Sequence, residues 1–546
     1  MAMQSDIVIL GGGLAGMTLA LQIRGRHPRA TITVIERRHH PVPVSAHKVG
    51  ESTVEIGAHY LADVIDLREH LESHHLRKYG LRLFFGADKT GDLADAAELG
   101  ASHLLTLRSY QIDRGVLENH LAERLKSSGI ELIGGATVRA IELAEETDED
   151  DLHQVSYRSN GQTHTLRSRW VVDAMSRGSI IKRHLDLSED NGHECSSVWF
   201  RIADRIDIGQ WSGSAEWQQR CNQLPRWLST NHLVGPGYWV WLIPLASGST
   251  SIGIVFDNRL HDFDQLKTWE GTLDWLAEHQ PLCRRAIDES DGQLQDFLYL
   301  RNFSHGCKQV FSPRRWALTG EAGVFLDPFY SPGSDFIAIS NTYITDLICR
   351  DLAGEPFARQ ARLYERSFFS FYQSSLQLYR DQYPLFGHAR AMSAKTIWDY
   401  AYYWSILALF VFADRLTDTK LFVRNGVILD QVRQLHDQVQ AMFRTWASEE
   451  TEVNSTGLFV NQSELPLLVR LNRELSEVAD DDDAELDARL AANCRMLHAL
   501  AAEMRELTPE AAAECVSLHR VDPNLDQPLL TGLPERFVRG SEPVVA

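Results

Sequence analysis

The chain has 546 residues, of which 44% are hydrophobic and 23% are charged. At roughly 150 residues per domain, this length predicts two to four structural units, or one large α/β unit with additions. The composition is ordinary for a globular protein and excludes a disordered, collagenous or multi-span membrane chain. The formal net charge of −20 argues against nucleic acid and anionic lipid as partners, because both require clustered lysine and arginine.

The cysteines are dispersed, and no two of them have CxxC spacing. This pattern is typical of reduced thiols in the cytoplasm, rather than of a disulfide framework or a zinc site. The N-terminus shows no secretory signal, because no basic region precedes the first predicted strand. We therefore expect a cytoplasmic protein without a bound metal and without a transmembrane segment.

The first predicted elements form a β–α–β unit. Residues 6–10 are a short apolar run that ends in glycines, which indicates a buried strand. Residues 15–23 have helical spacing, and residues 30–36 indicate a second strand. Together they predict the start of an α/β fold with a parallel sheet.

Three glycines lie between the first strand and the helix, in the pattern GxGxxG. They are Gly11, Gly13 and Gly16, and Glu36 ends the second strand. Glycines let the backbone approach a pyrophosphate, the helix N-terminus favours its negative charge, and an acidic side chain can accept from a ribose hydroxyl. The sequence therefore predicts a dinucleotide site of the Rossmann type, and this pattern alone leaves NAD and FAD both open.

The rest of the chain divides into a β-rich middle and a helical end. In order, we expect a helix at 110–128, strands at 130–141 and 169–175, a β-rich section at 190–300, a strand at 316–320, a helix at 336–352 and almost wholly helical structure from about 355. The acidic run at 480–483 is predicted to be a solvated helix start or loop.

One apolar stretch bears on the membrane question. Residues 400–413 contain no charged side chain, but they are shorter than the roughly 18–20 residues that span a bilayer. A buried helix is the favoured interpretation. The alternative is an apolar helix that lines a substrate tunnel or rests on a membrane.

Three later segments favour FAD over NAD. They are residues 111–121, with Asp113 and Arg114 at a helix start, residues 170–179, with Asp173 at a strand end, and residues 316–333, with Gly320 and Glu321 at a turn. In this order they resemble three segments of the FAD-dependent monooxygenase superfamily. The last resembles the second flavin motif, where the family normally has Gly-Asp; glutamate can still accept from the ribityl chain.

Two further motifs narrow the resemblance. Residues 239–244 read WxWxIP, and residues 325–333 read FxxPxxSxG. In this order they resemble the signatures of the flavin-dependent halogenase family, and HKVGES at 47–52 resembles its flavin-contacting loop. The resemblance covers about residues 5–345. It implies a Rossmann-type FAD-binding module at 1–190 and 300–350, a β-sheet substrate layer at 190–300 and a helical C-terminal region at 351–546.

In the family, reduced FAD and oxygen give a flavin hydroperoxide, and halide attacks its distal oxygen to form hypohalous acid. The acid travels through a tunnel to a lysine, which either carries it as a haloamine or orients it by hydrogen bonding. An electron-rich aromatic ring is then halogenated. Residues 77–86 resemble the Lys-x-Gly stretch of halogenases that act on phenols and pyrroles, which implies Lys78 as the catalytic lysine.

The resemblance assigns two sets of binding residues. Cofactor contacts are implied for Gly11, Gly13, Leu14, Ala15, Gly16, Glu36, Arg37, Lys48, Glu51, Arg114, Asp173, Glu321 and Gly333. A halide or flavin-proximal site is implied for Trp239, Trp241, Pro328, Ser331, Gly333 and Ser334.

Two positions depart from the family pattern. Tryptophan halogenases have a glutamate where this chain has Tyr330, so free tryptophan is disfavoured as the substrate. The family's halide turn uses backbone N–H groups, and Pro332 has none, although Gly333 and Ser334 can still donate. Losing one donor would weaken halide binding by about 1–3 kcal/mol.

The sequence leaves three functional hypotheses. The first is a phenol- or pyrrole-type halogenase, with an aromatic substrate that is free or tethered to a carrier protein. A single GxGxxG pattern favours a separate flavin reductase as the source of reduced FAD. The second is a related flavin monooxygenase or oxidase without halide chemistry, and the third is a non-catalytic flavoprotein.

Overall fold

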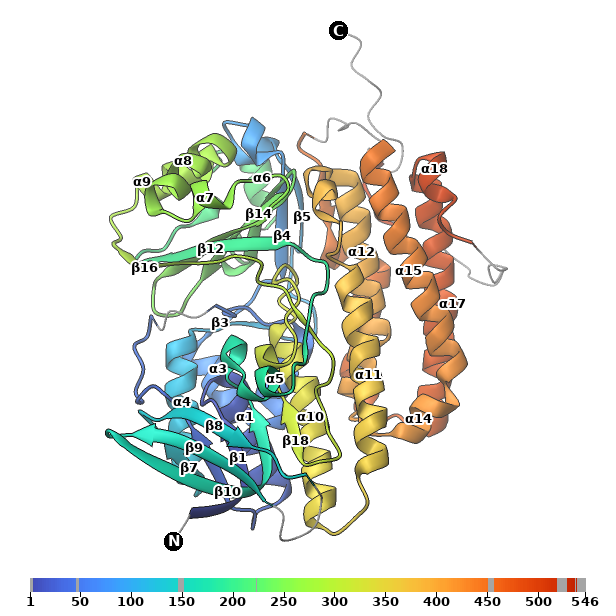
Figure 1. Cartoon of the computed structure of the whole chain (residues 1–546). Helices are drawn as coiled ribbons and strands as arrows, with labels where there is room; N and C mark the ends of the chain where they lie inside the picture. The colour runs from blue at the N-terminus through green and yellow to red at the C-terminus, as the bar shows by residue number, and fades with distance from the viewer. Residues whose placement is uncertain are drawn as a thin grey trace.

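The computed structural model describes residues 3–45, 49–145, 152–221, 223–449, 456–517, 528–535 and 537. Figure 1 shows three parts: a sheet that holds the N-terminus, a second sheet with short helices on its outer side, and a group of long helices that stands beside both. This is the α/β architecture with a Rossmann-like domain, mixed sheets and a helical C-terminal region that the sequence predicts.

The N-terminal sheet has a parallel centre. Its strands are β7 (Glu131–Ile133), β2 (Ile32–Ile35), β1 (Met3–Leu10), β10 (Gln162–Asp173), β9 (His153–Ser159), β8 (Thr137–Glu142) and β18 (Trp316–Leu318). β1 pairs in parallel with β2 and β10, and β18 pairs in parallel with the carboxyl end of β10. β7 also pairs in parallel with β2. The carboxyl ends of these five strands therefore meet at one edge, where ligands of open α/β sheets bind.

The helices of this part are α1 (Leu14–Arg26), α2 (Glu55–His59), α3 (Arg68–His74), α4 (Arg114–Ser127) and α5 (Ile180–His184). Two expectations need correction. The strand expected at 130–141 is two strands, β7 and β8, because Gly135 has φ +68° and turns the chain between them. The helix expected from residue 110 begins at Arg114, because residues 110–111 pair as β6 (Tyr110–Gln111) with β3 (Leu76–Arg77).

The second sheet has eight strands. Their order is β16 (Leu294–Leu300), β12 (Cys195–Ile202), β15 (Thr250–Asp257), β14 (Tyr238–Pro244), β13 (Thr230–Gly235), β4 (Leu81–Phe85), β5 (Ala97–Gly100) and β19 (Phe459–Asn461). The expected β-rich section supplies five of these strands. β4 and β5 come from earlier in the chain, and β19 comes from the C-terminal region. Segments from the N-terminal, middle and C-terminal regions of the sequence therefore share one sheet.

Both faces of this sheet are apolar. Along β14, Val240 and Leu242 point into a core with the helices α8 (Trp269–His279) and α9 (Pro281–Asp288). Trp239 and Trp241 point the other way, into the main core. Successive strand residues face opposite sides, so a run of bulky residues can fill two cores at once.

The long helices form the third part of the molecule (Figure 1). The helices from residue 333 onward are α10 (Gly333–Leu352), α11 (Ala358–Gln377), α12 (Ala389–Ser405), α13 (Leu407–Phe412), α14 (Thr419–Arg424), α15 (Gly426–Glu449), α16 (Pro466–Glu477), α17 (Asp483–Leu507) and α18 (Glu510–Ala513). Of these, α13, α14 and α18 are short, and α10 packs against α1 in the N-terminal part. The structure after 355 is almost wholly helical, as predicted, and its exception is the three-residue strand β19, which pairs in parallel with β5. The acidic run caps α17, where Asp482 and Glu485 form a capping box.

The apolar stretch at 400–413 lies in α12 and α13, which are separated by a break at Ile406. Leu407, Leu409 and Phe410 are buried, as the favoured interpretation predicts. Within the described residues, no helix combines the length and apolar character needed to span a membrane. Tyr400 lines two internal cavities, so the same helix also provides walls for a ligand.

Candidate functional site

The turn after β1 accepts only glycine at two positions. Gly11 has φ +106°, and a Cβ atom there would lie 2.5 Å from the carbonyl oxygen of Ala174. A Cβ atom at Gly16 would lie 2.0 Å from the carbonyl oxygen of Gly11. Gly13 is the N-cap of α1, so the N–H groups of the first helical turn are open toward the turn. The turn therefore has the tight backbone geometry that the prediction of a pyrophosphate cradle requires.

Glu36 lies beside this turn and holds it. Its two carboxylate oxygens accept hydrogen bonds from the backbone N–H groups of Gly12, at 2.7 Å, and Arg38, at 2.9 Å. Arg37 next to it is exposed. The pair lies at the end of β2, where the acidic side chain of a Rossmann site contacts the ribose.

A large cavity of about 1260 Å³ opens between the two sheets and the start of α10. Of the residues predicted to contact cofactor or halide, those that line it are Leu14, Glu51, Arg114, Trp239, Trp241, Glu321, Pro328, Ser331, Gly333 and Ser334. Other lining residues are mostly apolar and include Trp199, Phe303 and Phe325. Segments that lie far apart in the sequence thus meet around one hollow.

Charged groups at the edge of this cavity are paired. The Arg201 guanidinium donates to Glu51 Oε1 at 2.8 Å and also contacts Asp296. Burial raises the pKa of Glu51, and Arg201 opposes that shift. Arg114 donates to the carbonyl of Val49 at 2.7 Å, so it braces the loop before Glu51.

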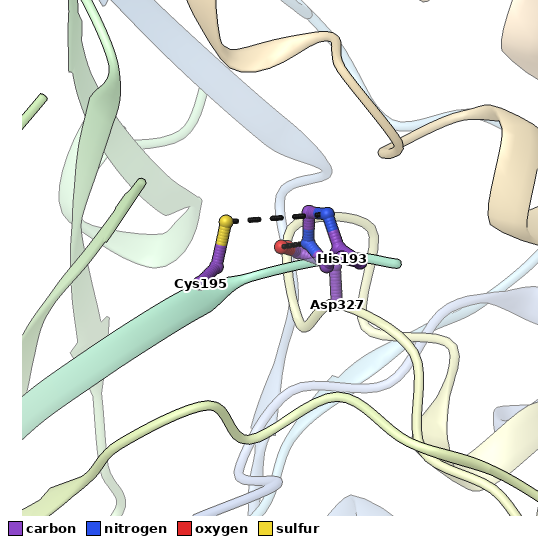
Figure 2. A group of neighbouring side chains, drawn as sticks. All are labelled: His193, Cys195 and Asp327. Carbon is purple, nitrogen blue, oxygen red and sulfur yellow. Dashed lines mark hydrogen bonds and ion pairs between the residues drawn. The ribbon is translucent and has the colours of Figure 1, made fainter. Parts of the chain in front are cut away.

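Trp239 is anchored by a chain of hydrogen bonds. Its indole Nε1 donates to the Tyr383 hydroxyl at 3.0 Å, and that hydroxyl donates to Asp327 Oδ2 at 2.6 Å. His193 Nε2 lies 2.7 Å from the same Asp327 oxygen, and Cys195 Sγ lies 4.0 Å from His193 Nδ1 (Figure 2). All of these side chains are buried, and Asp327 also lines the large cavity.

His193, Cys195 and Asp327 are close enough together to raise the question of a metal site. The imidazole uses opposite nitrogens for its two neighbours, Nε2 for the carboxylate and Nδ1 for the thiol (Figure 2). One ligand atom from each residue lies within 4.8 Å of the others, but the imidazole of His193 already bonds the carboxylate of Asp327 directly. The arrangement is that of a hydrogen-bonded relay that fixes Asp327 and, through Tyr383, Trp239.

The predicted halide turn leads directly into a helix. Ser331 has φ +56°, its N–H donates to the carbonyl of Pro328 at 2.9 Å, and Pro332 is the N-cap of α10. Gly333 and Ser334 are the first two residues of this helix, whose N–H groups have no earlier helical carbonyl to bond. The Ser334 hydroxyl is buried without a hydrogen-bond partner. Proline therefore occupies a capping position, and two backbone donors remain for an anion.

Lys78 lies outside the large cavity but contacts its wall. Its Nζ donates to Ser52 Oγ at 2.9 Å and to the carbonyl of Thr53 at 2.8 Å, and Ser52 lines the large cavity. The side chain of Lys78 is buried, and burial lowers its pKa to about 7, against the opposing charges of Glu55 and Asp335. Lys78 itself lines another cavity, of about 490 Å³, which we call the acceptor cavity.

A connecting cavity of about 530 Å³ lies between these two. It shares Pro332 and Phe336 with the large cavity, and Glu55 and Tyr400 with the acceptor cavity. The three hollows therefore follow one another from the turn before α10 to Lys78. This is the placement expected of a tunnel between a cofactor and a reactive lysine.

Sequence reasoning missed two acidic side chains near Lys78. Glu55 is the first residue of α2, and Asp335 is the third residue of α10. Burial raises the pKa of Asp335 to about 8, although the Tyr403 hydroxyl and the Gly57 N–H both donate to it. Neither residue belongs to a recognisable motif, and only the tertiary packing brings them to the lysine.

Tyr330 also has a clear structural role. Its hydroxyl donates to Asp399 at 2.8 Å, and Asp399 pairs with the buried ammonium of Lys395 at 2.5 Å. Burial raises the pKa of Asp399, and Lys395 opposes that shift. The aromatic ring that replaces the glutamate of tryptophan halogenases is thus fixed in the wall of the connecting cavity.

Comparison with known proteins agrees with this geometry. Residues 9–73 match the family of NAD(P)-binding Rossmann-like domains. The flavin-dependent halogenase chlA of Dictyostelium discoideum is 26% identical over 435 residues, which cover 74% of this chain and 70% of that protein. The pyrrole-2-carbonyl carrier-protein chlorinase of Pseudomonas fluorescens is 22% identical over 348 residues, covering 60% of this chain and 72% of that protein. Over most of its length the chain is therefore similar in sequence to flavin-dependent halogenases.

Solved halogenase structures share its fold. The halogenase PltM, in complex with phloroglucinol and FAD, has a TM-score of 0.63 at 18% identity and covers 94% of this chain and 98% of its own. The brominase Bmp2 has a TM-score of 0.56 at 20% identity and covers 70% of this chain and 87% of its own. The match to PltM extends through the long helices, so the helical region is part of the halogenase fold seen in that protein.

Within this halogenase fold, some predicted contacts lie away from the large cavity. Asp173 is buried and accepts hydrogen bonds from the backbone N–H groups of Met175, Ile180 and Ile181, so it organises the loop after β10. Ala15 packs at the turn of Gly320, where a Cβ atom would come within 3.1 Å of the alanine methyl. Lys48 lies outside the described residues.

Proposed function

We propose that the protein halogenates an electron-rich, phenol- or pyrrole-like aromatic substrate, using reduced FAD, oxygen and halide, with Lys78 as the catalytic residue. The observation that supports this most is the position of Lys78. Its Nζ is hydrogen-bonded to Ser52 of the large cavity, while its side chain lines the acceptor cavity. One buried lysine thus contacts the walls of both chambers.

The residues present fit FAD. The backbone cradle at Gly11 and Gly16 suits the pyrophosphate, and Glu36 suits the ribose. The large cavity has room for a flavin ring between the tryptophan strand and the turn before α10. When bound, reduced FAD with oxygen supplies the oxidising equivalent that converts halide into hypohalous acid.

The turn before α10 fits a halide. The N–H groups of Gly333 and Ser334, the unpaired Ser334 hydroxyl and the positive end of a twenty-residue helix all favour a small anion at the cavity wall. The chain as a whole is strongly acidic, so such local donors are what allows a halide to approach.

Lys78 then handles the oxidised halogen. Its two hydrogen bonds go to uncharged acceptors, Ser52 Oγ and Thr53 O, which leaves a third N–H of the ammonium to donate to hypohalous acid. Such a hydrogen bond to the oxygen makes the halogen more electrophilic and holds it at the entrance of the acceptor cavity. The surrounding burial keeps water from consuming the acid.

The sequence holds a single GxGxxG pattern, and it lies in the turn after β1. This supports the supply of reduced FAD by a separate flavin reductase. The acceptor cavity is lined largely by aromatic and branched apolar side chains, which suits a small aromatic substrate. A free and a carrier-tethered substrate are both compatible with this lining, so the test compares free and tethered forms of one aromatic.

The test is product analysis. The protein would be incubated with FAD, a flavin reductase, NADH and oxygen, with a panel of phenols and with a pyrrole supplied free or on a carrier protein, with and without bromide. We expect brominated product only when bromide is present. Hydroxylated product that is independent of bromide would contradict the proposal and favour a monooxygenase. Bound flavin without product of either kind would favour a non-catalytic flavoprotein.

A further inference from the structure

The acceptor cavity contains polar groups that the proposed function does not use. Glu55 Oε2 is buried without a hydrogen-bond partner, and so is Gln462 Nε2. Both residues line the cavity, Glu55 from α2 and Gln462 from the segment after β19. The Tyr79 hydroxyl and the Trp404 indole N–H, which line the same cavity, are unpaired as well. Unpaired buried polar atoms cost free energy, so this group of donors and acceptors in one small cavity points to a polar ligand that satisfies Glu55 Oε2 and Gln462 Nε2.

The walls of this cavity suit an aromatic ring. Tyr400 and Trp404 of α12 line it, together with Leu105, Leu107 and Leu468. Flat aromatic and branched apolar side chains leave a slot in which a ring can stack or make edge contacts. The ring would lie beside Lys78, which lines the same slot.

The charges of the lining disfavour an anionic ligand. Glu55 and Lys78 bring opposite charges, and Lys78 already donates to two protein acceptors. Asp335, which influences Lys78, adds a second carboxyl group nearby. Among the described lining residues there is no arginine that could bind a carboxylate in two places. A neutral ligand avoids burial of an unpaired charge.

We propose that the acceptor cavity takes a free, uncharged hydroxyaromatic compound that also carries a carbonyl-type acceptor, and that Glu55 is the base that accepts the proton of the ring hydroxyl. The hydroxyl would donate to Glu55 Oε2 and the carbonyl would accept from Gln462 Nε2. This inference rests on the proposed function and assigns its substrate class.

The chemical step balances without a further reactant. A ring carbon activated by the hydroxyl forms a bond to the halogen, and the oxygen–halogen bond of hypohalous acid breaks. Glu55 takes the hydroxyl proton while the ring loses electron density, and returns it when the ring carbon loses its own proton. That ring proton joins the released hydroxide as water. The net change is replacement of ring hydrogen by halogen, with hypohalous acid becoming water.

The first test measures ligand binding by calorimetry, with no flavin reduction and therefore no turnover. The probes are resacetophenone, a resorcinol ring with an acetyl group, its dimethyl ether, resorcinol, and β-resorcylate, which has a carboxylate in place of the acetyl group. We expect resacetophenone to bind about 10-fold more tightly than either the ether or resorcinol. The ether cannot donate a hydrogen bond to Glu55, and resorcinol has no carbonyl to accept one from Gln462. β-Resorcylate should bind more weakly than resacetophenone; tighter binding of the carboxylate would overturn the proposal.

The second test uses Glu55→Gln, which keeps the shape of the side chain but removes the base. We expect its affinity for resacetophenone to fall about 10-fold and its affinity for the dimethyl ether to stay unchanged. The matched control is Glu278→Gln, since Glu278 is 71% exposed and far along the chain. Equal resacetophenone binding by wild type and Glu55→Gln would overturn the proposal.

A second variant keeps the test decisive if Glu55→Gln does not fold. Gln462→Leu should weaken resacetophenone about 10-fold and leave resorcinol unchanged, because only the former carries the acetyl acceptor. Equal loss for both ligands would contradict the assignment. Oxidant release from bromide, measured without any aromatic ligand, reports on the proposed function alone. Its absence would refute halogenase activity, whereas normal release with unaltered ligand selectivity would refute only this inference.

Discussion

The large cavity and the acceptor cavity differ in the polar groups that line them. The large cavity is built from backbone turns and indoles, and its charged side chains, such as Glu51 and Arg201, are already paired. The acceptor cavity holds a lysine and a glutamate whose polar atoms are buried in apolar surroundings. This difference indicates separate roles for the two cavities. Hypohalous acid would form in the large cavity, whose groups are already paired, and would react in the acceptor cavity, whose side chains can accept or donate a proton. Lys78 lines the acceptor cavity and is hydrogen-bonded to Ser52 in the wall of the large cavity, so substitutions at Lys78 test this division.

Lys78→Ala should give the largest effect. Halogenated product should fall by about 10²–10⁴-fold, the range typical of a lost proton-handling side chain, while flavin binding and bromide oxidation continue. Product and oxidant would be measured in parallel, with the exposed Lys126→Ala as the matched control. Normal halogenation by Lys78→Ala would remove the proposed link between the chambers.

Gly16→Ala tests the turn after β1, which we assign to the pyrophosphate of FAD. The new Cβ atom would lie 2.0 Å from the carbonyl oxygen of Gly11, so the turn must shift. We expect the Kd for FAD to rise by about 10- to 100-fold, equal to about 1.4–3 kcal/mol, as measured by equilibrium dialysis. Gly25→Ala in the same helix is the control, because its Cβ atom would have no neighbour within 4 Å. Similar affinities in both variants would contradict the assigned cradle.

Tyr383→Phe tests the anchoring of Trp239. It removes the hydroxyl that links the indole N–H to Asp327, and it leaves two buried polar groups short of a partner. The free energy of unfolding should fall by about 1–3 kcal/mol, and more oxygen should be lost as hydrogen peroxide per product formed. Tyr299→Phe is the control, since Tyr299 is 51% exposed. An unchanged peroxide yield would mean that the anchor does not influence the large cavity.

The smallest effect concerns pH. Burial lowers the pKa of Lys78 to about 7, so the side chain is an ammonium donor below that pH and a neutral amine above it. If the ammonium orients hypohalous acid, the halogenation rate falls as the pH rises through about 7, by up to tenfold per unit. Bromide oxidation without an acceptor, measured over the same range, is the control. A rate that instead rises through this range would favour a haloamine formed by the neutral lysine.

The sequence predicted the large cavity better than the acceptor cavity, for a physical reason. Gly11, Gly16 and the turn at Ser331 meet backbone constraints that few residues satisfy, so they leave a pattern that can be read without a structure. Lys78 was found only through its resemblance to the Lys-x-Gly stretch. No sequence motif predicted its acidic neighbours, Glu55 and Asp335.

Glu55 and Gln462 show why the remaining site residues could not be predicted. Each is an ordinary polar residue in sequence, and only the packing of α2 and of the segment after β19 around one cavity gives them a common ligand. β19 itself was missed because three residues within a helical region carry almost no strand signal. β19 is a strand because it pairs with β5, which lies more than 350 residues earlier in the chain.

The division between the two chambers can be observed directly in a crystal of the protein with FAD, bromide and resacetophenone. Anomalous scattering would locate the bromide, and ordinary density would locate the ring. The account predicts bromide at the N–H groups of Gly333 and Ser334 and the ring beside Lys78 and Glu55 in the acceptor cavity. A ring bound in the large cavity, or bromide bound at Lys78 instead of the turn, would contradict it.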